Sequence, residues 1–365
     1  MGNLIFSSVK QLRKTDLLRF NNCLFYKDFF EFVEKTHQNL VTPYYFTRFK
    51  EKRLVAFSPG FIQKKKIPVT FDLDEYLGDD AKLKKLVPVE KVLLMHTPFR
   101  LRSEILGDEK EHKSELLRHI DQVAFQNECD AVVFPFVLEH NKTLHEALAG
   151  AGYIRSFYEA DFYLKTDFDT YDDFLSSLDG KVRKQYLNDK NRLKKHNISI
   201  DQVLDVSAFK EIFYEMHKSL MKKYHHKSLE FKRDSFEEFS NTIENSICFI
   251  AHKDGKILGY SLSIHDTDTL YCLRCCQSHE MENARVYFNL LFETSVKKAI
   301  ELGCKSIGFG KESHRTKMLR GCSYDKGFVY VRFLDSAKHA LFSSRVNSLD
   351  RIKKDMFKRK IFPST

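Results

Sequence analysis

The residues with the clearest capacity for chemistry follow a short apolar stretch, residues 306–310, late in the chain. Glu312, His314 and Lys317 come directly after it. A carboxylate or an imidazole can take a proton from an attacking group, and a lysine can contact a phosphate or a developing oxyanion. We predict Glu312 and His314 as candidate bases and Lys317 as the charged contact. The alternative is a solvated basic turn in which none of the three has such a role.

Arg274 is the second unusual position, because it lies within an otherwise apolar stretch, residues 269–276. Burying an unpaired guanidinium is costly, so this side chain must be paired or face a cleft. We predict that it contacts a carboxylate or a phosphate of a substrate, with structural pairing as the alternative. Tyr287 and Tyr324 are predicted to line the same pocket, or else to pack as ordinary aromatic residues.

A strand, a helix and a second strand are predicted to position these side chains within residues 271–332. Apolar and small residues recur at about 3.6-residue spacing, as in a helix packed on one side, at Phe288, Leu291, Phe292, Ser295, Ala299 and Leu302. Glu293, Lys297 and Glu301 fall on the other side. Gly303 ends this helix where a positive φ is needed. Side chains that follow the second strand would then collect at an edge of the sheet.

The rest of the chain predicts an α/β fold with mixed, mostly antiparallel sheets flanked by helices. The expected strands are residues 43–49, 54–58, 91–96, 131–136, 158–165, 247–252, 257–264, 269–276 and 328–333. The expected helices are residues 21–36, 113–128, 142–149, 181–195 and 207–224. Thr170, with Asp173 three residues on, predicts a further helix start.

Length and cysteine usage limit the kind of protein. A chain of 365 residues, 42% of them hydrophobic, is predicted to form two domains. The eight cysteines lie mostly in apolar runs, which favours buried reduced thiols. Cys272 and Cys275 have the C-x-x-C spacing but lack a second ligand pair, and His225 and His226 point apart on a helix. We therefore predict no metal site.

The hydropathy of the chain predicts no integral membrane segment. No run approaches the ~20 apolar residues that a membrane helix needs, and the first residues are apolar too briefly for a signal peptide. We therefore expect a cytoplasmic protein.

The charge of the chain indicates either a solvated basic surface or an attraction for a polyanion. The formal net charge is +10, and basic residues gather at positions 64–66, 181–195, 218–233 and 351–360. Clustered positive charge raises the local concentration of RNA or of an acidic cofactor. We predict RNA or phosphate contacts for Arg183, Lys184 and Arg192 in the helix 181–195, and for Arg320. The alternative for this helix is a solvated basic face.

Three segments together resemble a known family. "FIAHKDGKILGYSLSI" and the following strand, helix and "AIELGCKSIGFG" are similar to the GNAT acyltransferase fold. "YDDFLSSLDGKVRKQYLNDKNRLKKHNISI" resembles the basic helix that the Fem-type peptidoglycan aminoacyltransferases and their FemAB-like relatives place between two halves. "FNLLFETSVKKAIELGCKSIGFGKESHRTKMLRG" resembles the helix, strand and lysine turn of their second half. The resemblance covers about residues 161–333.

This resemblance implies two GNAT-like domains, at residues 1–168 and 201–365, joined by a basic connecting helix at 169–200. It also implies an enzyme that transfers an acyl or aminoacyl group to an amine. The amine must be neutral to attack, so a base or desolvation removes its proton. The oxyanion that develops needs a donor or a cation where the central strands splay.

The donor is the point at which the sequence departs from the GNAT pattern. GNAT enzymes hold the pyrophosphate of coenzyme A with a glycine-rich loop at a helix N-terminus. The corresponding residues 278–285 contain no glycine and two acids, and no glycine occurs between Gly259 and Gly303. Residues 97–102 with Gly107 could bind the pyrophosphate instead, but the acidic residues beside them reduce the positive charge there. Because Fem-type enzymes use aminoacyl-tRNA, the resemblance implies that donor and no tightly bound cofactor.

Two alternatives stay open. One is an N-acyltransferase that uses acyl-CoA, and the other is a non-catalytic GNAT-like protein that binds RNA or a cell-wall precursor. The acceptor, a small amine or a peptide, and the oligomeric state are left open by the sequence.

Overall fold

The structure, a computed structural model, describes residues 2–37, 41–63, 71–97, 99, 102–107, 109–223, 231–278 and 283–362, without the side chain of residue 63. The basic cluster 64–66, the pair His225–His226 and residues 279–282 of the glycine-free loop lie outside the described residues. The chain forms two compact units. Unit 1 is Met1–Phe20, Leu24–Ala160 and Asp325–Thr365, and unit 2 is Asn21–Cys23 and Asp161–Tyr324.

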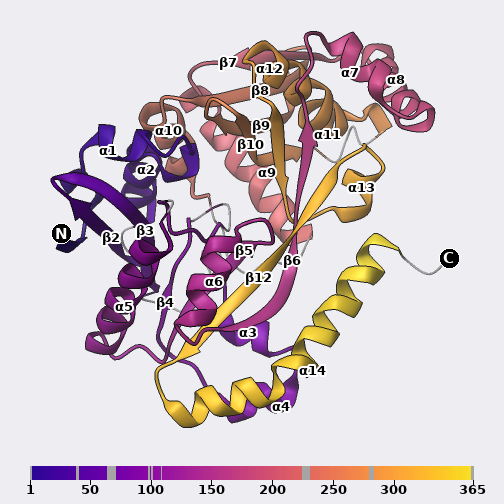
Figure 1. Cartoon of the computed structure of the whole chain (residues 1–365). Helices are drawn as coiled ribbons and strands as arrows, with labels where there is room; N and C mark the ends of the chain where they lie inside the picture. The colour runs from indigo at the N-terminus through magenta and orange to yellow at the C-terminus, as the bar shows by residue number, and fades with distance from the viewer. Residues whose placement is uncertain are drawn as a thin grey trace. The chain divides into compact units, whose positions relative to one another are not determined.

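Six of the described strands lie in unit 1 as part of a 12-stranded sheet, in the order β1-β2-β3-β4-β5-β12. Their bounds are β1 (Gly2–Phe6), β2 (Val41–Lys50), β3 (Arg53–Gln63), β4 (Val92–Leu94), β5 (Ala131–Leu138) and β12 (Ser323–Phe333). Only β4 and β5 pair in parallel; the other neighbours are antiparallel. The predicted hairpin at residues 43–58 is β2 with β3 (Figure 1).

The part of the 12-stranded sheet in unit 2 repeats this scheme in the order β7-β8-β9-β10-β11-β6, with Asp161–Lys165 of β6 in this unit and Ile154–Ala160 in unit 1. Its strands are β7 (Ser199–Val203), β8 (Ser246–Lys253), β9 (Lys256–His265), β10 (Thr269–Gln277), β11 (Ser306–Gly310) and β6 (Ile154–Lys165). Again only the fourth and fifth strands, β10 and β11, pair in parallel. Each parallel pair is joined by a helical crossover, as parallel strands require.

The sixth strand in each of these two orders comes from an unexpected part of the chain. β6 precedes the other strands of unit 2, and β12, which completes unit 1, is the last strand of the chain. The compact units therefore differ from the segments 1–168, 169–200 and 201–365, which stay a prediction about domains. The predicted fold class is confirmed: an α/β chain with mixed, mostly antiparallel sheets and flanking helices.

The helices of unit 1 pack their apolar faces around an aromatic core. They are α1 (Lys14–Leu18), α2 (Lys27–His37), α3 (Leu73–Leu77), α4 (Ala81–Leu86), α5 (Lys110–Gln126), α6 (Lys142–Gly150) and α14 (Ser336–Ile361), with short 3₁₀ turns at Val9–Gln11 and Cys23–Phe25. Asp72 and Asp80 cap α3 and α4, each accepting two backbone N–H bonds. Such caps satisfy donors that a helix start leaves unpaired.

The helices of unit 2 are α7 (Tyr171–Ser177), α8 (Gly180–Lys195), α9 (Lys210–Lys223), α10 (Arg233–Thr242), α11 (Val286–Phe288), α12 (Ser295–Glu301) and α13 (His314–Met318), with a 3₁₀ turn at Ser207–Phe209 and a π-helix at Asn289–Thr294. The predicted helix start at Thr170 is confirmed, because its Oγ1 accepts a hydrogen bond from the Asp173 N–H at 3.1 Å. Gly303 has φ +70°, as the predicted helix end requires. No helix among the described residues is long and apolar enough to cross a bilayer.

Two local expectations were wrong. The crossover between β10 and β11 is not one regular α-helix, because a π-helix occupies its middle. The wider π turn departs from 3.6-residue spacing, so Glu293 is buried beside Lys297, with 2.6 Å between Oε1 and Nζ, instead of facing outward. The predicted polar turn after β11 contains the short helix α13, which buries His314 and Lys317.

Candidate active site

The candidate site lies where β10 and β11 of unit 2 part. The two strands pair from Thr269↔Ser306 to Tyr271↔Gly308, after which β10 continues to Gln277 while β11 ends at Gly310. A bulge next to Arg274 shifts the pairing of β10 with β9, and bulges bend the strand that carries them. Backbone groups at the end of β11 therefore lose β10 as a partner.

Lys317 occupies this position. Its side chain leaves α13, turns back to the end of β11 and is only 3% exposed. Its Nζ donates hydrogen bonds to the Phe309 carbonyl at 2.9 Å and to the Gly310 carbonyl at 2.8 Å. The ammonium also lies 5.4 Å from the ring centre of Phe162, a cation–π distance. Lys317 thus fixes a positive charge at the parting of the strands.

Two further predicted residues gather around the same phenylalanine. The ring of His314 meets Phe162 edge to face at 5.3 Å, and the ring of Tyr324 lies 5.7 Å from it. We call Phe162, His314, Lys317 and Tyr324 the Phe162 cluster. Glu312 is exposed and is not part of it. Phe162 itself was missed by the sequence reasoning, because a phenylalanine in a strand looks like any core residue.

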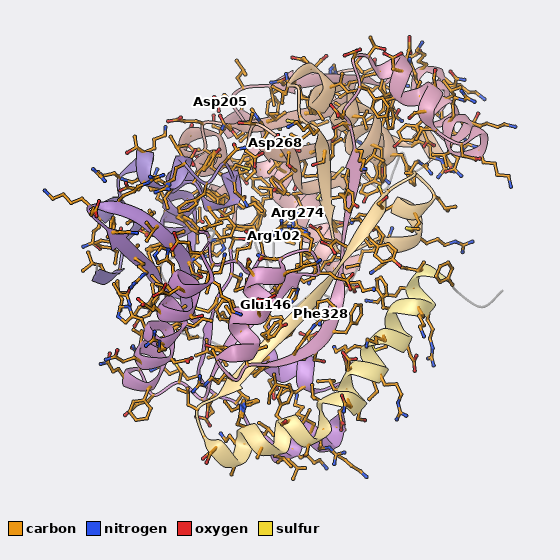
Figure 2. The ribbon with its side chains drawn as sticks, viewed as in Figure 1. Arg102, Glu146, Asp205, Asp268, Arg274 and Phe328 are labelled. Atoms are coloured by element: carbon orange, nitrogen blue, oxygen red, sulfur yellow. The ribbon has the colours of Figure 1, made fainter. Side chains whose placement is uncertain are left out.

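Arg274 and Tyr287 are placed on β10 and at the start of the following helix. The Arg274 guanidinium, labelled in Figure 2, lies 5.7 Å from the ring centre of Phe231. Burial raises the pKa of the Cys276 thiol to about 11, and the charge of Arg274 opposes that shift. The Tyr287 N–H donates to Gln277 Oε1 at 2.8 Å. The substrate contacts predicted for Arg274 and Tyr287 stay predictions.

Arg320 lies inside unit 2 and connects α8 to the end of α13, the helix that carries Lys317. Its Nη2 lies 2.5 Å from Asp189 Oδ2, and its Nη1 donates to Gln185 Oε1. The Tyr186 hydroxyl, also on α8, donates to the Arg320 carbonyl at 3.2 Å. Burial raises the pKa of Asp189, and Arg320 opposes the shift. The predicted phosphate contact of Arg320 stays a prediction, whereas its ion pair is a feature of the fold.

The outer face of α8 is cationic. Arg183, Lys184 and Arg192 are exposed there, together with Lys181, Lys194 and Lys195. Asp189, the acid within α8, is buried on the inner face, where it pairs with Arg320 and also feels the charge of Arg192. A group of exposed cations is suited to a polyanion such as a nucleic-acid backbone. The single acid of α8 comes three residues after Tyr186, which places both on one side of the helix. This spacing could have identified the inner face from the sequence, and it was missed.

The loop before α5 gives little support to a phosphate site in unit 1. Arg102 is paired with Glu104 at 2.6 Å between Nε and Oε1, which neutralises its charge. Gly107 has φ +113°, and a Cβ there would lie 2.4 Å from the Val55 carbonyl. This glycine is therefore needed for close approach to β3. Residues 98, 100, 101 and 108 of the loop lie outside the described residues.

The residues that the structure describes form neither a metal site nor a reactive thiol. Among the residues that the structure describes, no group of three or more His, Cys, Asp or Glu side chains could hold a metal ion. The eight cysteines are free thiols. Burial raises the pKa of Cys275 well above its ordinary value, and a protonated thiol is a poor ligand or nucleophile.

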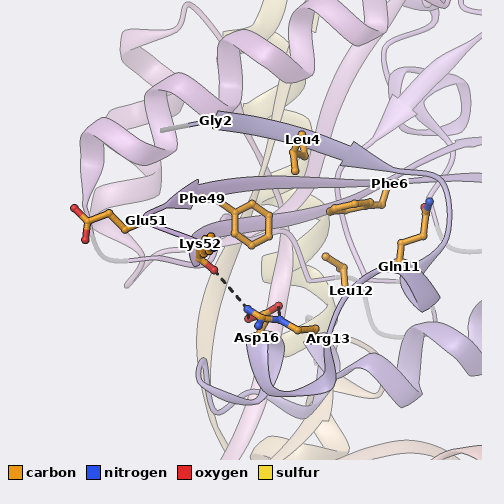
Figure 3. A pocket seen from close by; sticks show the side chains of 10 residues that line it. All are labelled: Gly2, Leu4, Phe6, Gln11, Leu12, Arg13, Asp16, Phe49, Glu51 and Lys52. Carbon is orange, nitrogen blue, oxygen red and sulfur yellow. Dashed lines mark hydrogen bonds and ion pairs between the residues drawn. The ribbon is translucent and has the colours of Figure 1, made fainter.

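A cavity of about 530 Å³ lies in unit 1, apart from these residues (Figure 3). It is bordered by β1, the β2–β3 turn and α1. Leu4, Phe6, Leu12 and Phe49 form its apolar part, and the ion pair of Arg13 with Asp16 lies at its edge. None of the predicted site residues lines it, so it carries no part of the catalytic hypothesis.

Solved structures define the class of fold. FemX is similar over 94% of this chain and 100% of its own, with a TM-score of 0.66 and 12% identity. The C-terminal domain of a putative lysylphosphatidylglycerol synthetase from Agrobacterium fabrum is similar over 93% of this chain and 96% of its own, with a TM-score of 0.57 and 12% identity. A tandem GNAT protein from the clavulanic acid biosynthesis pathway is similar over 91% of this chain and 98% of its own, with a TM-score of 0.53 and 9% identity. The fold is that of the tandem GNAT proteins.

The family follows from the sequence. The model of the FemAB-like family, described as peptidoglycan biosynthesis or recognition, matches residues 90–351. The chain therefore belongs to the FemAB-like family, as the resemblance predicted. A comparison with curated proteins gives no match.

Proposed function

We propose that this protein is an acyltransferase that moves an aminoacyl group from an aminoacyl-tRNA to an amine of a small molecule or peptide. The observation that carries the proposal is the buried ammonium of Lys317, held at the parting of β10 and β11. A fixed cation in a water-poor site stabilises an oxyanion more strongly than a cation in water does. Membership of the FemAB-like family supports the same class of reaction.

The reaction begins with a neutral amine beside the ester carbonyl of the donor. The amine nitrogen forms a bond to the carbonyl carbon, and the carbonyl oxygen becomes an oxyanion near Lys317. A base accepts the proton of the amine; His314, next to Lys317 in the Phe162 cluster, is the better placed candidate, and Glu312 is the exposed one. The ester carbon–oxygen bond then breaks, and the ribose oxygen of the tRNA takes a proton.

The outer face of α8 supports tRNA as the donor. Arg183, Lys184 and Arg192 give an exposed cationic face, and α8 is bonded through Asp189 and Arg320 to the turn after Lys317. An RNA backbone bound there would lie on the unit that holds the candidate site. The glycine-free sequence between Gly259 and Gly303 argues against the alternative, a tightly held acyl-CoA.

A transfer assay with two donors tests the proposal. The full chain is supplied with a peptide amine and either charged tRNA or acyl-CoA, with and without ribonuclease. We expect transfer from charged tRNA that ribonuclease abolishes. Transfer driven by acyl-CoA alone would overturn the tRNA donor. RNA binding without turnover from either donor would overturn the enzyme and favour the non-catalytic alternative.

The role of Lys317 is tested with Lys317→Met and Lys317→Arg. Loss of an oxyanion-stabilising group lowers kcat about 100-fold or more, and we expect this for Lys317→Met, with partial recovery in Lys317→Arg. The matched control is Lys305→Met, because Lys305 is an exposed lysine paired with Asp268 just before β11. Circular dichroism must show each variant folded at the assay temperature. Full kcat in folded Lys317→Met would refute the site.

The role of α8 is tested by replacing Arg183, Lys184 and Arg192 with Gln. Each lost phosphate contact lowers the slope of log affinity against log salt concentration by about one. We therefore expect weaker tRNA binding with a shallower salt dependence, and an unchanged kcat at saturating donor. An unchanged slope would remove α8 from the RNA contact.

A further inference from the structure

The last turns of α14 show a second cationic surface, on which the exposed large apolar side chains are Met356 and Phe362, whereas α8 exposes Leu187. This helix ends at Ile361, next to the last described residue, Phe362 (Figure 1). Its inner side is held in unit 1: Phe357 packs edge to face on Phe157 at 5.3 Å, and Lys360 pairs with Glu159 at 2.8 Å. Because Ile361 is also buried there, the opposite side of these turns faces outward.

The outward side carries a row of charged residues and, at the end of the helix, a large apolar side chain. Arg351, Asp355 and Lys358 follow the i, i+4, i+7 spacing of a helix face, and Phe362 comes four residues later as the C-cap residue. Phe362 is 73% exposed, and Met356, three residues before Arg359 on the same helix, is 41% exposed. We call Arg351, Met356, Lys358, Arg359 and Phe362 the α14 patch.

The cations of the α14 patch are available to a partner. Arg351, Lys358 and Arg359 are exposed, and within the described part of the chain their side chains make no ion pair. The neighbouring Lys354 is paired with Asp350 at 2.5 Å. Asp355 is the acid in the row, so the patch keeps a net positive charge.

We propose that the α14 patch docks on the surface of an anionic lipid bilayer. Lys and Arg side chains reach lipid phosphates while apolar side chains enter the boundary between headgroups and acyl chains. Phe362 and Met356 supply the apolar part, and the three cations supply the attraction to anionic lipid. A nucleic-acid backbone would use the cations alone and would leave Met356 without a role. This docking does not depend on the proposed transfer reaction.

Vesicle co-sedimentation of the full chain tests this inference. We expect binding to vesicles of phosphatidylcholine with phosphatidylglycerol, little binding to phosphatidylcholine alone, and weakening by salt. Removing each cation with Arg351→Gln, Lys358→Gln or Arg359→Gln should lower the partition coefficient about fivefold, corresponding to about 1 kcal/mol per charge. Phe362→Ser should lower it about tenfold or more, because an inserted aromatic ring is lost.

Phe125→Ser is the matched control, because Phe125 is 75% exposed near the end of α5 but is followed by Gln126, Asn127 and Glu128 instead of cations. It should bind vesicles like the unchanged chain. Equal losses in Phe125→Ser and Phe362→Ser, or equal binding to neutral and anionic vesicles, would overturn the inference. The inference would also be overturned if RNA displaced the chain from the vesicles and Phe362→Ser bound the vesicles as well as the unchanged chain does. The patch would then be a site for polyanions in general.

Discussion

Replacing Arg320 with Met separates an internal role for this arginine from the RNA contact predicted from the sequence. The Arg320 and Asp189 side chains are 8% and 11% exposed, and Nη2 and Oδ2 lie 2.5 Å apart. The guanidinium also lies 4.5 Å from the ring centre of Phe288. Met keeps the apolar stem of this contact but removes the charge. Asp189 then stays buried without its main counter-charge.

The expected cost is about 3 kcal/mol of unfolding free energy. Removing one partner of a buried ion pair costs about 3 to 5 kcal/mol, because the remaining charge is uncompensated. Arg285, whose Nε lies 3.8 Å from Asp189 Oδ1, retains part of the attraction, so we take the lower value. Replacing both partners, with Arg320→Met and Asp189→Leu, should cost less than the sum of the single changes.

The loss in Arg320→Met should depend on pH. Burial already raises the pKa of Asp189 above its ordinary 3.8, and removing Arg320 raises it further. A carboxyl group with a raised folded pKa contributes stability that is present below the unfolded pKa and lost as pH rises through the folded pKa. The deficit should therefore be largest at neutral pH and smaller towards pH 3.8.

Urea unfolding followed by circular dichroism is the suitable assay, because the chain has no Trp. Arg285→Met is the control: its side chain is 40% exposed and more distant from Asp189, so its loss should cost less than about 1 kcal/mol. A cost for Arg320→Met as small as that of this control would refute the buried ion pair. Weaker tRNA binding at unchanged stability would then restore the predicted phosphate contact.

Two further predictions concern local structure, and both are measured by the same urea unfolding. Thr170→Ala removes the cap of α7 and should cost about 1 kcal/mol, whereas Thr170→Ser should cost little; equal stability of the two would contradict the cap. Gly259→Ala puts a Cβ 2.8 Å from the Cys276 carbonyl and should cost about 1 to 3 kcal/mol, while Gly150→Ala, with nothing within 4 Å, should not destabilise. Equal effects of the two alanines would contradict the close packing of β9 on β10.

The fold class could be predicted because periodicity and turn residues report local structure. The hairpin of β8 and β9, the N-cap at Thr170 and the helix end at Gly303 each rest on neighbours in sequence. The pairing of β12 with β5 joins residues that lie far apart in the chain, and no local pattern indicates which strand completes which part of the sheet. The π-helix at Asn289–Thr294 was also invisible, because its residues fit an ordinary apolar helix.

The candidate site could be predicted in composition but not in geometry. The sequence indicated that Glu312, His314 and Lys317 follow a strand, which the structure confirms. It gave no sign that α13 buries two of them and leaves Glu312 exposed, because three polar residues in a row of charges look uniformly solvated. Burial was decided by carbonyls at the end of β11, which accept the Lys317 hydrogen bonds and depend on where β10 departs.

The two faces of α8 explain why direct and indirect effects on RNA binding must be distinguished. Asp189 on the inner face pairs with Arg320, while Arg183, Lys184 and Arg192 are exposed on the outer face. Breaking the inner pair would shift α8 without removing any outer cation. Arg320→Met should therefore weaken tRNA binding with an unchanged salt slope, because the number of phosphate contacts stays the same. Loss of Arg192 should lower that slope by about one, so the salt dependence separates the two faces.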